Sequence, residues 1–542
     1  MIYLDNAATS FPKPAEVAEA MARFLAEAAA NPGRGGHRMA VNAERMLDDV
    51  RVRIARLVNG SDPSRVIFTL NCTDALNIAI KGVLPDERVH VVTTVLEHNS
   101  VSRPLQGLAD AGRIELTRVG CDGQGFVDPD DVRRALRPDT RLVVMTHASN
   151  VLGTIQDAGA VGAIVREHGA LFCVDAAQTA GVVPIDVAAL CADLIAFPGH
   201  KALLGPTGTG ILYVGERCPP PGRKLGSEPA FAAEGLAEKL GSEPDFPPPT
   251  RGTMHSDPRE KMASHPHGEK MGSHPQGEKT GSHPYVEKTG SDPRGGESSF
   301  DRRAGESSFD RRAGESSFDP RAGESSSDPR AGESSSDPRA GKSSFDPRLG
   351  KSSFDPRTGK SGSDPNFSAG GGKGSDPNFR PWREGGTGGD SSSPTQPPVY
   401  PHYLEGGTPN TVGIAGLGAA LDFVLARGPD AALAHERRLL ERILAHVDGD
   451  ERITVYGPRD TARRVGALSI NIAGLDPNDA AAILDDAFGI AVRAGLHCAP
   501  YCHRAIGTFP AGTLRISPGP FTTDDDLAAL LDALDQVAEA GM

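Results

Sequence analysis

Leu171-Phe172-Cys173-Val174-Asp175-Ala176-Ala177-Gln178 is a short apolar run that ends on a carboxylate and, three residues later, an amide. Similar apolar runs occur elsewhere in the first 220 residues, at Val66–Leu70, Val89–Thr93, Leu142–Met145, Leu194–Phe197 and Ile211–Val214. Amphipathic stretches with helical spacing lie between the runs, at Ala15–Ala30, Asn42–Val58, Thr73–Lys81 and Ala158–Glu167. This alternation of short strands and helices predicts an α/β fold with a mostly parallel, doubly wound sheet.

The C-terminal part of the chain has a different pattern. Helices are expected at Thr411–Ala426, Asp430–His446, Pro477–Phe488 and Asp524–Ala540, and strands at Ile453–Tyr456, Val465–Ile472 and Leu514–Ser517. The mixture predicts a second, smaller α+β domain. We expect the large domain to comprise residues 1–218 and 383–426, and the small C-terminal domain to comprise residues 427–542.

Residues 219–382 are rich in Gly, Ser, Pro, Asp, Arg and Glu and contain a nine-residue repeat, marked by Gly296, Gly305, Gly314, Gly323, Gly332, Gly341, Gly350 and Gly359. Calcium-binding β-helices share this period. These repeats, however, lack paired glycines and an inward aliphatic residue, and their prolines cannot donate to a strand ladder. We therefore expect a disordered insertion, which adds only about 2 kcal/mol of loop-closure entropy to the fold.

Composition excludes several classes of protein. No apolar run approaches the roughly 18 residues of a membrane span, and a net charge of −14 argues against a nucleic-acid partner. The seven cysteines lack the spacing of a disulfide framework or a zinc site. The first residues lack the basic and apolar segments of a signal peptide, so we expect a cytoplasmic protein.

Polar motifs follow five of the predicted strands: Asn71-Cys72-Thr73-Asp74, Glu97-His98-Asn99-Ser100, His147-Ala148-Ser149-Asn150, Asp175-Ala176-Ala177-Gln178 and Gly199-His200-Lys201. Each motif alone is more often structural, as a helix cap, a turn or a solvated lysine. The carboxyl ends of parallel strands meet at one edge of a sheet, so we expect the motifs to converge. Together they supply what a pyridoxal phosphate site needs: a Schiff-base lysine, a carboxylate for the pyridinium nitrogen, a phosphate cup and a flat group over the ring.

The sequence resembles the class V aminotransferase family of pyridoxal phosphate enzymes of fold type I, and within it the cysteine desulfurases and selenocysteine lyases. The resemblance rests on Tyr3-Leu4-Asp5-Asn6-Ala7-Ala8-Thr9, His147-Ala148-Ser149-Asn150-Val151-Leu152-Gly153-Thr154, Val174-Asp175-Ala176-Ala177-Gln178, Gly199-His200-Lys201, Gly407-Thr408-Pro409-Asn410-Thr411 and Arg493-Ala494-Gly495-Leu496-His497-Cys498-Ala499. It implies pyridoxal 5'-phosphate as the cofactor.

The resemblance also implies a role for each matching residue. Lys201 would form the Schiff base, Asp175 would pair with the pyridinium nitrogen, and His98 would stack on the ring. The other expected cofactor contacts are Gln178 at the ring hydroxyl, Thr73, Asp74 and His200 at the phosphate side, and Thr408 at the phosphate of a neighbouring subunit. Asn150, Arg493 and Arg515 would bind the substrate, with the carboxylate held by Asn150 and Arg515. The reach of Thr408 implies a homodimer. Pro198 departs from the family pattern, because desulfurases often have there a serine that contacts the phosphate.

Cys498 decides between desulfuration and transamination. The family's sulfur-accepting cysteine occupies this motif, and we expect Arg493, Gly495 and His497 to supply positive charge and backbone freedom to it. The resemblance thus implies conversion of L-cysteine to L-alanine, with a persulfide left on Cys498. The short Cys498–Arg515 stretch is similar to the SufS-like branch, which implies a sulfur-acceptor protein and a role in iron–sulfur cluster assembly.

Two questions stay open at the level of sequence. The same cofactor could serve a selenocysteine lyase acting on L-selenocysteine, a transaminase or an epimerase, and a scaffold that displays the repeats is a non-catalytic alternative. The intact set of Lys201, Asp175, His98, Cys498 and Arg515 argues against the scaffold. Cys502 is either a bystander or a thiol that attacks the Cys498 persulfide.

Overall fold

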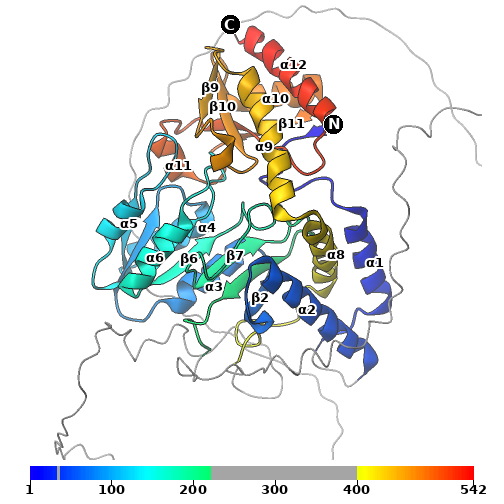
Figure 1. Cartoon of the computed structure of the whole chain (residues 1–542), viewed down its shortest axis with the longest axis vertical. Helices are drawn as coiled ribbons and strands as arrows, with labels where there is room; N and C mark the ends of the chain where they lie inside the picture. Colours follow the sequence, from blue (N-terminus) through cyan, green and yellow to red (C-terminus); the bar gives the residue numbers. More distant parts are fainter. Residues whose placement is uncertain (33–36, 221–398, 542) are drawn as a thin grey trace, which may run out of the picture. The chain divides into compact units, whose positions relative to one another are not determined.

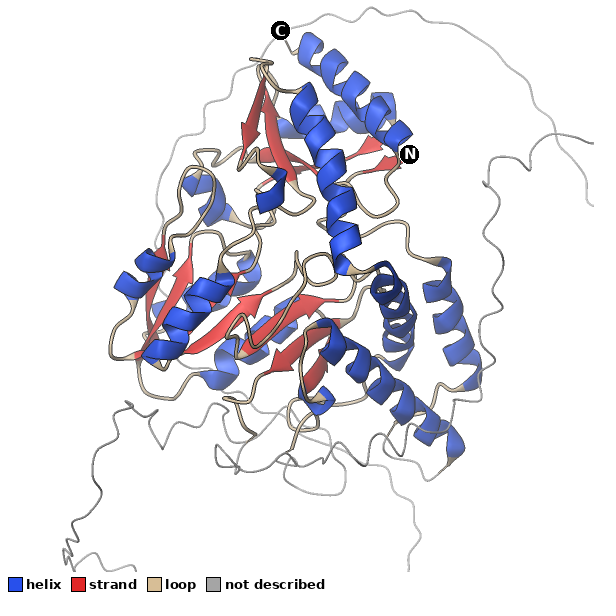
Figure 2. Cartoon of the chain, in the orientation of Figure 1, coloured by secondary structure: helices blue, strands red, loops and turns tan. Residues whose placement is uncertain are grey.

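The computed structural model describes residues 1–32, 37–220 and 399–541. The predicted disordered insertion therefore lies outside the described residues, except at its first two positions, as does the start of the segment expected to continue the large domain. The boundaries of the two domains stay predictions. Figures 1 and 2 show the described helices and strands.

A seven-stranded sheet organises the first half of the described chain. Its strand order is β2-β8-β7-β6-β5-β3-β4. The strands are β2 (Val66–Thr69), β3 (Val89–Thr94), β4 (Ile114–Val119), β5 (Thr140–Thr146), β6 (Leu171–Asp175), β7 (Leu194–Pro198) and β8 (Gly210–Val214). Of these seven strands, β8 alone runs opposite to the other six, which confirms a mostly parallel sheet. Strand β4 was not predicted, because its middle residues, which include Glu115 and Arg118, are only half-buried at the sheet edge and give no apolar run.

Helices cover both faces of this sheet, which is why its strands are apolar at successive positions. In β5, Leu142 and Val144 pack into a cluster with α3 (Cys72–Val83) and α4 (Asn99–Asp110). Val143 and Met145 point the other way, into a cluster with α2 (Arg38–Leu57), α6 (Ala158–His168) and α8 (Thr411–Arg427). Helix α1 (Ala15–Glu27) lies beside α8 (Figure 1). The shorter elements are α5 (Pro129–Ala135) and the 3-10 turn η1 (Pro63–Arg65).

The C-terminal part forms a four-stranded antiparallel sheet in the order β12-β13-β10-β9. Its elements are α9 (Pro429–His446), β9 (Ile453–Tyr456), η3 (Thr461–Arg463), β10 (Leu468–Ile472), α10 (Pro477–Phe488), β11 (Ile490–Ala491), β12 (Arg493–Gly495), α11 (Pro500–Ala505), β13 (Thr513–Ile516) and α12 (Asp524–Ala540). One apolar cluster joins the sheet to α9, α10 and α12. The N-terminal strand β1 (Ile2–Tyr3) pairs in parallel with β11, so the chain begins against its own C-terminal part.

Element bounds differ from the predicted ones in places. Strand β10 begins at Leu468 and not at Val465, because the preceding residues bond to another loop: Val465 donates to the Gly153 carbonyl, and Arg464 forms a bridge with Thr154. Taken singly, no described helix is long and apolar enough to cross a membrane. Helices α8 and α9 satisfy that length and composition test only as a pair bent by 76°.

Candidate active site

The five predicted polar motifs lie after strands β2, β3, β5, β6 and β7, all of which run in the same direction. Their carboxyl ends therefore share one edge of the sheet, as expected for a ligand site in a doubly wound fold. A cavity opens beside Lys201 and Gln178 at this edge. Among the described residues, no group of three or more His, Cys, Asp or Glu side chains is placed to hold a metal ion.

Asp175 and Lys201 form the charged centre of this edge. Asp175 ends β6 and is buried; its Oδ1 accepts from the Ala177 N–H at 2.9 Å and lies 3.8 Å from the Cys72 sulfur. Burial raises the pKa of Asp175 and lowers the pKa of Lys201, and each of the two opposite charges partly offsets the shift of the other. Within the described part of the chain, the Lys201 amine donates no hydrogen bond. A lysine with a lowered pKa and no fixed partner is a nucleophilic amine.

The backbone of Lys201 is clamped by the N-terminal segment. The His200 carbonyl accepts from the Thr9 hydroxyl at 3.0 Å and from the Lys13 ammonium at 2.8 Å, and the Lys201 carbonyl accepts from the Ser10 hydroxyl at 2.9 Å. Burial is also the main cause that lowers the pKa of His200 to about 4. His200 is therefore neutral near pH 7.

The N-terminus of α3 offers backbone donors to the same edge. Asn71 caps the helix: its Oδ1 accepts from the Asp74 N–H at 2.9 Å, and its carbonyl accepts from the Ala75 N–H at 3.1 Å. The N–H groups of Cys72 and Thr73 then have no partner among the described residues. Asp74 accepts from the Leu70 N–H at 3.2 Å, so its carboxylate serves the start of the helix. Free N–H groups at a helix start are suited to a phosphate.

His98 stands next to this helix start. Its Nδ1 lies 2.7 Å from the Ser100 hydroxyl oxygen, which in turn lies 2.9 Å from the hydroxyl oxygen of Thr73. Burial, followed by the nearby charges of Lys201 and Arg493, lowers the pKa of His98 to about 4. The ring is therefore neutral near pH 7 and is held at a fixed angle. Gln178 is oriented by a bond from its amide nitrogen to the Ala7 carbonyl at 3.0 Å.

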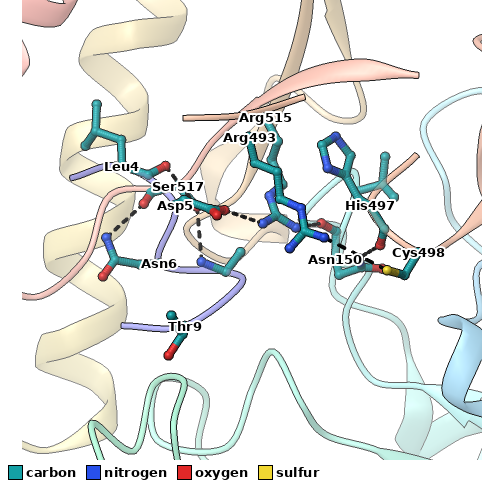
Figure 3. A network of polar contacts seen from close by, with 12 residues as sticks. Leu4, Asp5, Asn6, Thr9, Asn150, Arg493, His497, Cys498, Arg515 and Ser517 are labelled. Carbon is teal, nitrogen blue, oxygen red and sulfur yellow. Dashed lines mark hydrogen bonds and ion pairs between the residues drawn. The ribbon is translucent and has the colours of Figure 1, made fainter. Parts of the chain in front are cut away.

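The small sheet brings two arginines to the site. Arg493 on β12 pairs directly with Arg515 on β13, so their side chains lie on one face of the sheet. Arg515 is only 1% exposed. Its guanidinium donates to the Asn150 carbonyl at 2.9 Å and to Asp5 at 2.6 Å, as Figure 3 shows. Two neighbouring cations attract a carboxylate or a thiolate to this place.

Cys498 lies at the end of this positive group and is exposed. Its sulfur is 3.9 Å from Nη2 of Arg493, and its carbonyl accepts from the Asn99 N–H at 2.7 Å. Cys498 and the preceding His497 both adopt positive φ, at 60° and 47°. Two such residues in succession cost backbone strain, which is common at functional sites.

Asn150 and His497 tie the cysteine segment to the large sheet. The Asn150 side chain donates to the His497 carbonyl at 2.6 Å. The expectation that His497 adds positive charge is wrong, because burial, with the nearby Arg515 charge, lowers the pKa of His497 to about 2. Arg493 is the cation whose contact with the Cys498 sulfur the structure shows.

The structure also places two further residues to which the sequence analysis gave possible roles. Cys502 is buried inside α11 and belongs to the large apolar cluster, and burial raises the pKa of its thiol to about 12. A buried, protonated thiol is a poor nucleophile, which supports the bystander interpretation. Thr408 is exposed in the turn before α8, and the described structure does not bring it into contact with the other site residues. Pro198 ends β7.

Sequence reasoning assigned no role to Asp5, Ser10 or Lys13, although the first lies in a motif that carried the family resemblance. Asp5 contacts Arg515 across 510 positions of the chain, and no local pattern signals such a contact. The sequence did place Lys201, Asp175, His98, Asn150 and the two arginines in one site, where the structure brings them together.

A model of the class V aminotransferase family matches residues 2–224 and 373–530. The chain belongs to the class V aminotransferase family. A relative described as a probable cysteine desulfurase from Methanothermobacter thermautotrophicus is 27% identical over 541 residues, which cover 100% of this chain and 95% of the relative. Cysteine desulfurase IscS from Methylococcus capsulatus is 40% identical over 216 residues, which cover 39% of this chain and about half, 53%, of the relative.

Solved structures share the fold of this class V aminotransferase. The apo cysteine desulfurase of Thermococcus onnurineus NA1 aligns with a TM-score of 0.64 at 23% identity, covering 99% of this chain and 95% of that chain. The cysteine desulfurase CsdA of Escherichia coli aligns with a TM-score of 0.61 at 21% identity, covering 99% and 94%. These likenesses confirm the predicted fold type I architecture.

The cofactor of this family is pyridoxal 5'-phosphate, as predicted, and the residues of this chain fit it. The Lys201 amine is unpartnered within the described chain and has a lowered pKa. A buried carboxylate lies beside it in Asp175, and open backbone N–H groups stand at the start of α3. These are the amine, the anion and the phosphate donors that the cofactor requires.

Proposed function

We propose that this chain is a pyridoxal-phosphate-dependent cysteine desulfurase, which converts L-cysteine to L-alanine and keeps the sulfur as a persulfide on Cys498. The observation that carries the proposal is the placement of an exposed cysteine beside Arg493, on a segment tied to Asn99 and Asn150 at the cofactor edge. A transaminase has no use for a thiol at this position. The names of the relatives support the same activity.

The side chains at this edge of the sheet would hold the cofactor in place. Lys201 would bind its aldehyde carbon, Asp175 its pyridinium nitrogen and Gln178 its ring hydroxyl. The neutral ring of His98 would lie over the cofactor ring, and Thr73 and His200 would contact the phosphate together with the start of α3. When bound, the cofactor withdraws electrons from the substrate Cα and so weakens the bonds there.

Arg515 and Asn150 would bind the carboxylate of L-cysteine. Guanidinium offers the planar, paired N–H groups that a carboxylate accepts best. The backbone contacts of Arg515 and Asn150 fix both groups before substrate arrives. With its amine free, Lys201 would accept the Cα proton of the substrate, because burial keeps its pKa below that of a solvated lysine.

Cys498 would then act as the nucleophile. Its thiolate attacks the substrate sulfur, an S–S bond forms, and the C–S bond breaks with its electron pair left on the substrate carbon. Protonation of that carbon, with return of the proton from the Lys201 amine to Cα, gives L-alanine. Arg493, 3.9 Å from the cysteine sulfur, stabilises the anionic sulfur before and after transfer. The exposure of Cys498 allows a second molecule to collect the sulfur.

The decisive experiment compares wild type with Cys498→Ala, using Cys502→Ala as the matched control. Wild type and Cys502→Ala should release alanine from L-cysteine at similar rates and show a persulfide on Cys498 by mass spectrometry. Cys498→Ala should bind the cofactor normally and lose at least about 100-fold in alanine formation, since the covalent sulfur acceptor is gone. Undiminished alanine formation by Cys498→Ala would refute the proposed reaction.

We further propose a homodimer, a sulfur-acceptor protein as partner, cytoplasmic location and a role in iron–sulfur cluster assembly. The exposed position of Thr408 supports the homodimer, because an exposed side chain can reach a phosphate in another subunit. The exposed Cys498 supports transfer to an acceptor protein. Location and the role in cluster assembly follow from the family resemblance and the sequence expectations given above.

A further inference from the structure

The strongest unassigned contact in the site is the ion pair between Asp5 and Arg515. Asp5 Oδ1 accepts from Nη2 of Arg515 at 2.6 Å. The arginine side chain is 1% exposed and the aspartate side chain 20% exposed, so the pair is nearly out of water. A charge-assisted bond in such a place is both strong and directional. Figure 3 shows it within the network that leads to Cys498.

The backbone around Asp5 is bonded to Ser517, the residue directly after β13, which is the strand that carries Arg515. Asp5 forms a parallel bridge with Ser517, two residues beyond the arginine. The Ser517 N–H donates to the Leu4 carbonyl at 2.7 Å, and the Asn6 N–H donates to the Ser517 carbonyl at 3.1 Å. The position of the Asp5 carboxylate relative to Arg515 is therefore set by the main chain.

A count of donors shows what the pair leaves for a ligand. A guanidinium has five N–H groups. One on Nη1 is used by the Asn150 carbonyl and one on Nη2 by Asp5, while Nε has no partner in the described chain. Each terminal nitrogen thus keeps one N–H, and both nitrogens are already held in place. The Arg515 guanidinium is therefore already ordered when a substrate carboxylate binds to it.

We propose that Asp5 is a positioning residue for the substrate carboxylate, acting through Arg515. The inference rests on the proposed function, in which Arg515 binds the carboxylate of L-cysteine. The same N-terminal segment also holds the Lys201 backbone, through the Ser10 hydroxyl. The segment therefore contacts both Arg515 on the small sheet and Lys201 at the edge of the large sheet. Asp5 thereby sets the distance between the carboxylate site and the reacting centre.

Loss of Asp5 has two opposing effects on carboxylate binding. Without its acceptor oxygen, Arg515 loses the contact that orients Nη2, which weakens binding. Without its negative charge, the site repels the incoming carboxylate less, which strengthens binding. Asp5→Asn keeps an acceptor oxygen and removes the charge, whereas Asp5→Ala removes both. Comparison of the two variants therefore separates orientation from charge.

The test measures binding of L-alanine and of L-alaninamide, which lacks the carboxylate, to the cofactor-loaded protein by calorimetry. Asp5→Ala should bind L-alanine about tenfold more weakly and L-alaninamide as wild type does. Asp5→Asn should restore L-alanine binding to within about twofold of wild type or better. A matched control is Glu405→Gln, which disturbs the bidentate Arg51–Glu405 pair outside this site and should leave both affinities unchanged.

Two results would overturn the inference. One is an Asp5→Ala protein that binds L-alanine as tightly as wild type. The other is an equal loss of affinity for L-alanine and L-alaninamide, which would mean a general disturbance of the site. Because these ligands are bound without turnover, the outcome is separate from whether the chain proves to be a desulfurase.

Discussion

Among single residues, Lys13 and Lys201 are both candidates for the amine that reacts with the cofactor. Burial lowers the pKa of Lys201, and it also lowers the pKa of Lys13 to about 8. Lys13 donates to the Ser10 hydroxyl and the His200 carbonyl, whereas Lys201 donates no hydrogen bond within the described residues. The Lys13 amine has to break two hydrogen bonds before it can react with an aldehyde.

Borohydride reduction of the loaded protein should therefore attach the cofactor to Lys201 and leave Lys13 unmodified, as read by peptide mass spectrometry. Lys201→Ala should lose this covalent attachment. Lys13→Ala serves as the matched control and should retain it. Label found on Lys13 in the wild type would contradict the assignment of the site.

At the scale of elements, α9 carries a buried carboxyl group. Glu436 accepts from the Gly466 N–H at 2.9 Å, and burial raises its pKa from 4.5 to about 7. Between pH 4.5 and about pH 7 the folded protein keeps a proton on Glu436 that the unfolded chain releases. The free energy of unfolding is therefore highest below about pH 4.5 and falls as pH rises. Above about pH 7 the free energy of unfolding is lower by about 3 kcal/mol than it is below about pH 4.5.

Glu436→Gln should remove this pH dependence, because glutamine keeps the acceptor for Gly466 and has no charge to bury. We expect the variant to be more stable than wild type at pH 8, by up to about 3 kcal/mol, and similar at pH 5, in denaturant unfolding. The exposed Glu441 of the same helix provides the control, and Glu441→Gln should show no such difference between the two pH values. Equal stability of Glu436→Gln and wild type at pH 8 would show that the carboxyl group is solvated.

At the scale of the whole molecule, the two described chain ends that flank residues 221–398 are held close together. The Tyr400 hydroxyl donates to the Cys218 carbonyl at 2.9 Å. Glu405 accepts two bonds from Arg51, at 2.7 and 2.8 Å. A six-residue linker reaches up to about 20 Å, which is ample for ends in hydrogen-bond contact.

Replacement of residues 221–398 by a six-residue Gly-Ser linker should therefore leave turnover of L-cysteine within about twofold of wild type. Stability should be equal or higher, since the closed loop is far shorter and its closure costs less entropy. A comparison variant in which the linker replaces residues 219–405 also loses Tyr400 and Glu405 and should be clearly less stable in thermal unfolding. An inactive or insoluble first variant would show that the replaced segment is needed.

The strands of the large sheet and most of the site residues could be predicted from local patterns of residues. Runs such as 171–174 are apolar at every position, so they identify strands buried on both faces without knowledge of the fold. Helix ends can also be predicted from the nearby sequence. Helices α10 (Pro477–Phe488) and α12 (Asp524–Ala540) match the predicted bounds, because an Asp or Thr cap marks the start of each. The convergence of the polar motifs could be predicted as well, since parallel strands bring their carboxyl ends to one edge of the sheet.

The charge states of buried groups and the contacts between residues far apart in the chain became known from the folded structure. His497 and Cys502 stand near Cys498 in the sequence, yet burial makes the imidazole neutral and the thiol inert. Asp5 and Arg515 lie at opposite ends of the chain and meet because β1 pairs with β11 and Asp5 bridges to Ser517. Burial and long-range pairing depend on how the whole chain packs, and therefore no local pattern of residues encodes them.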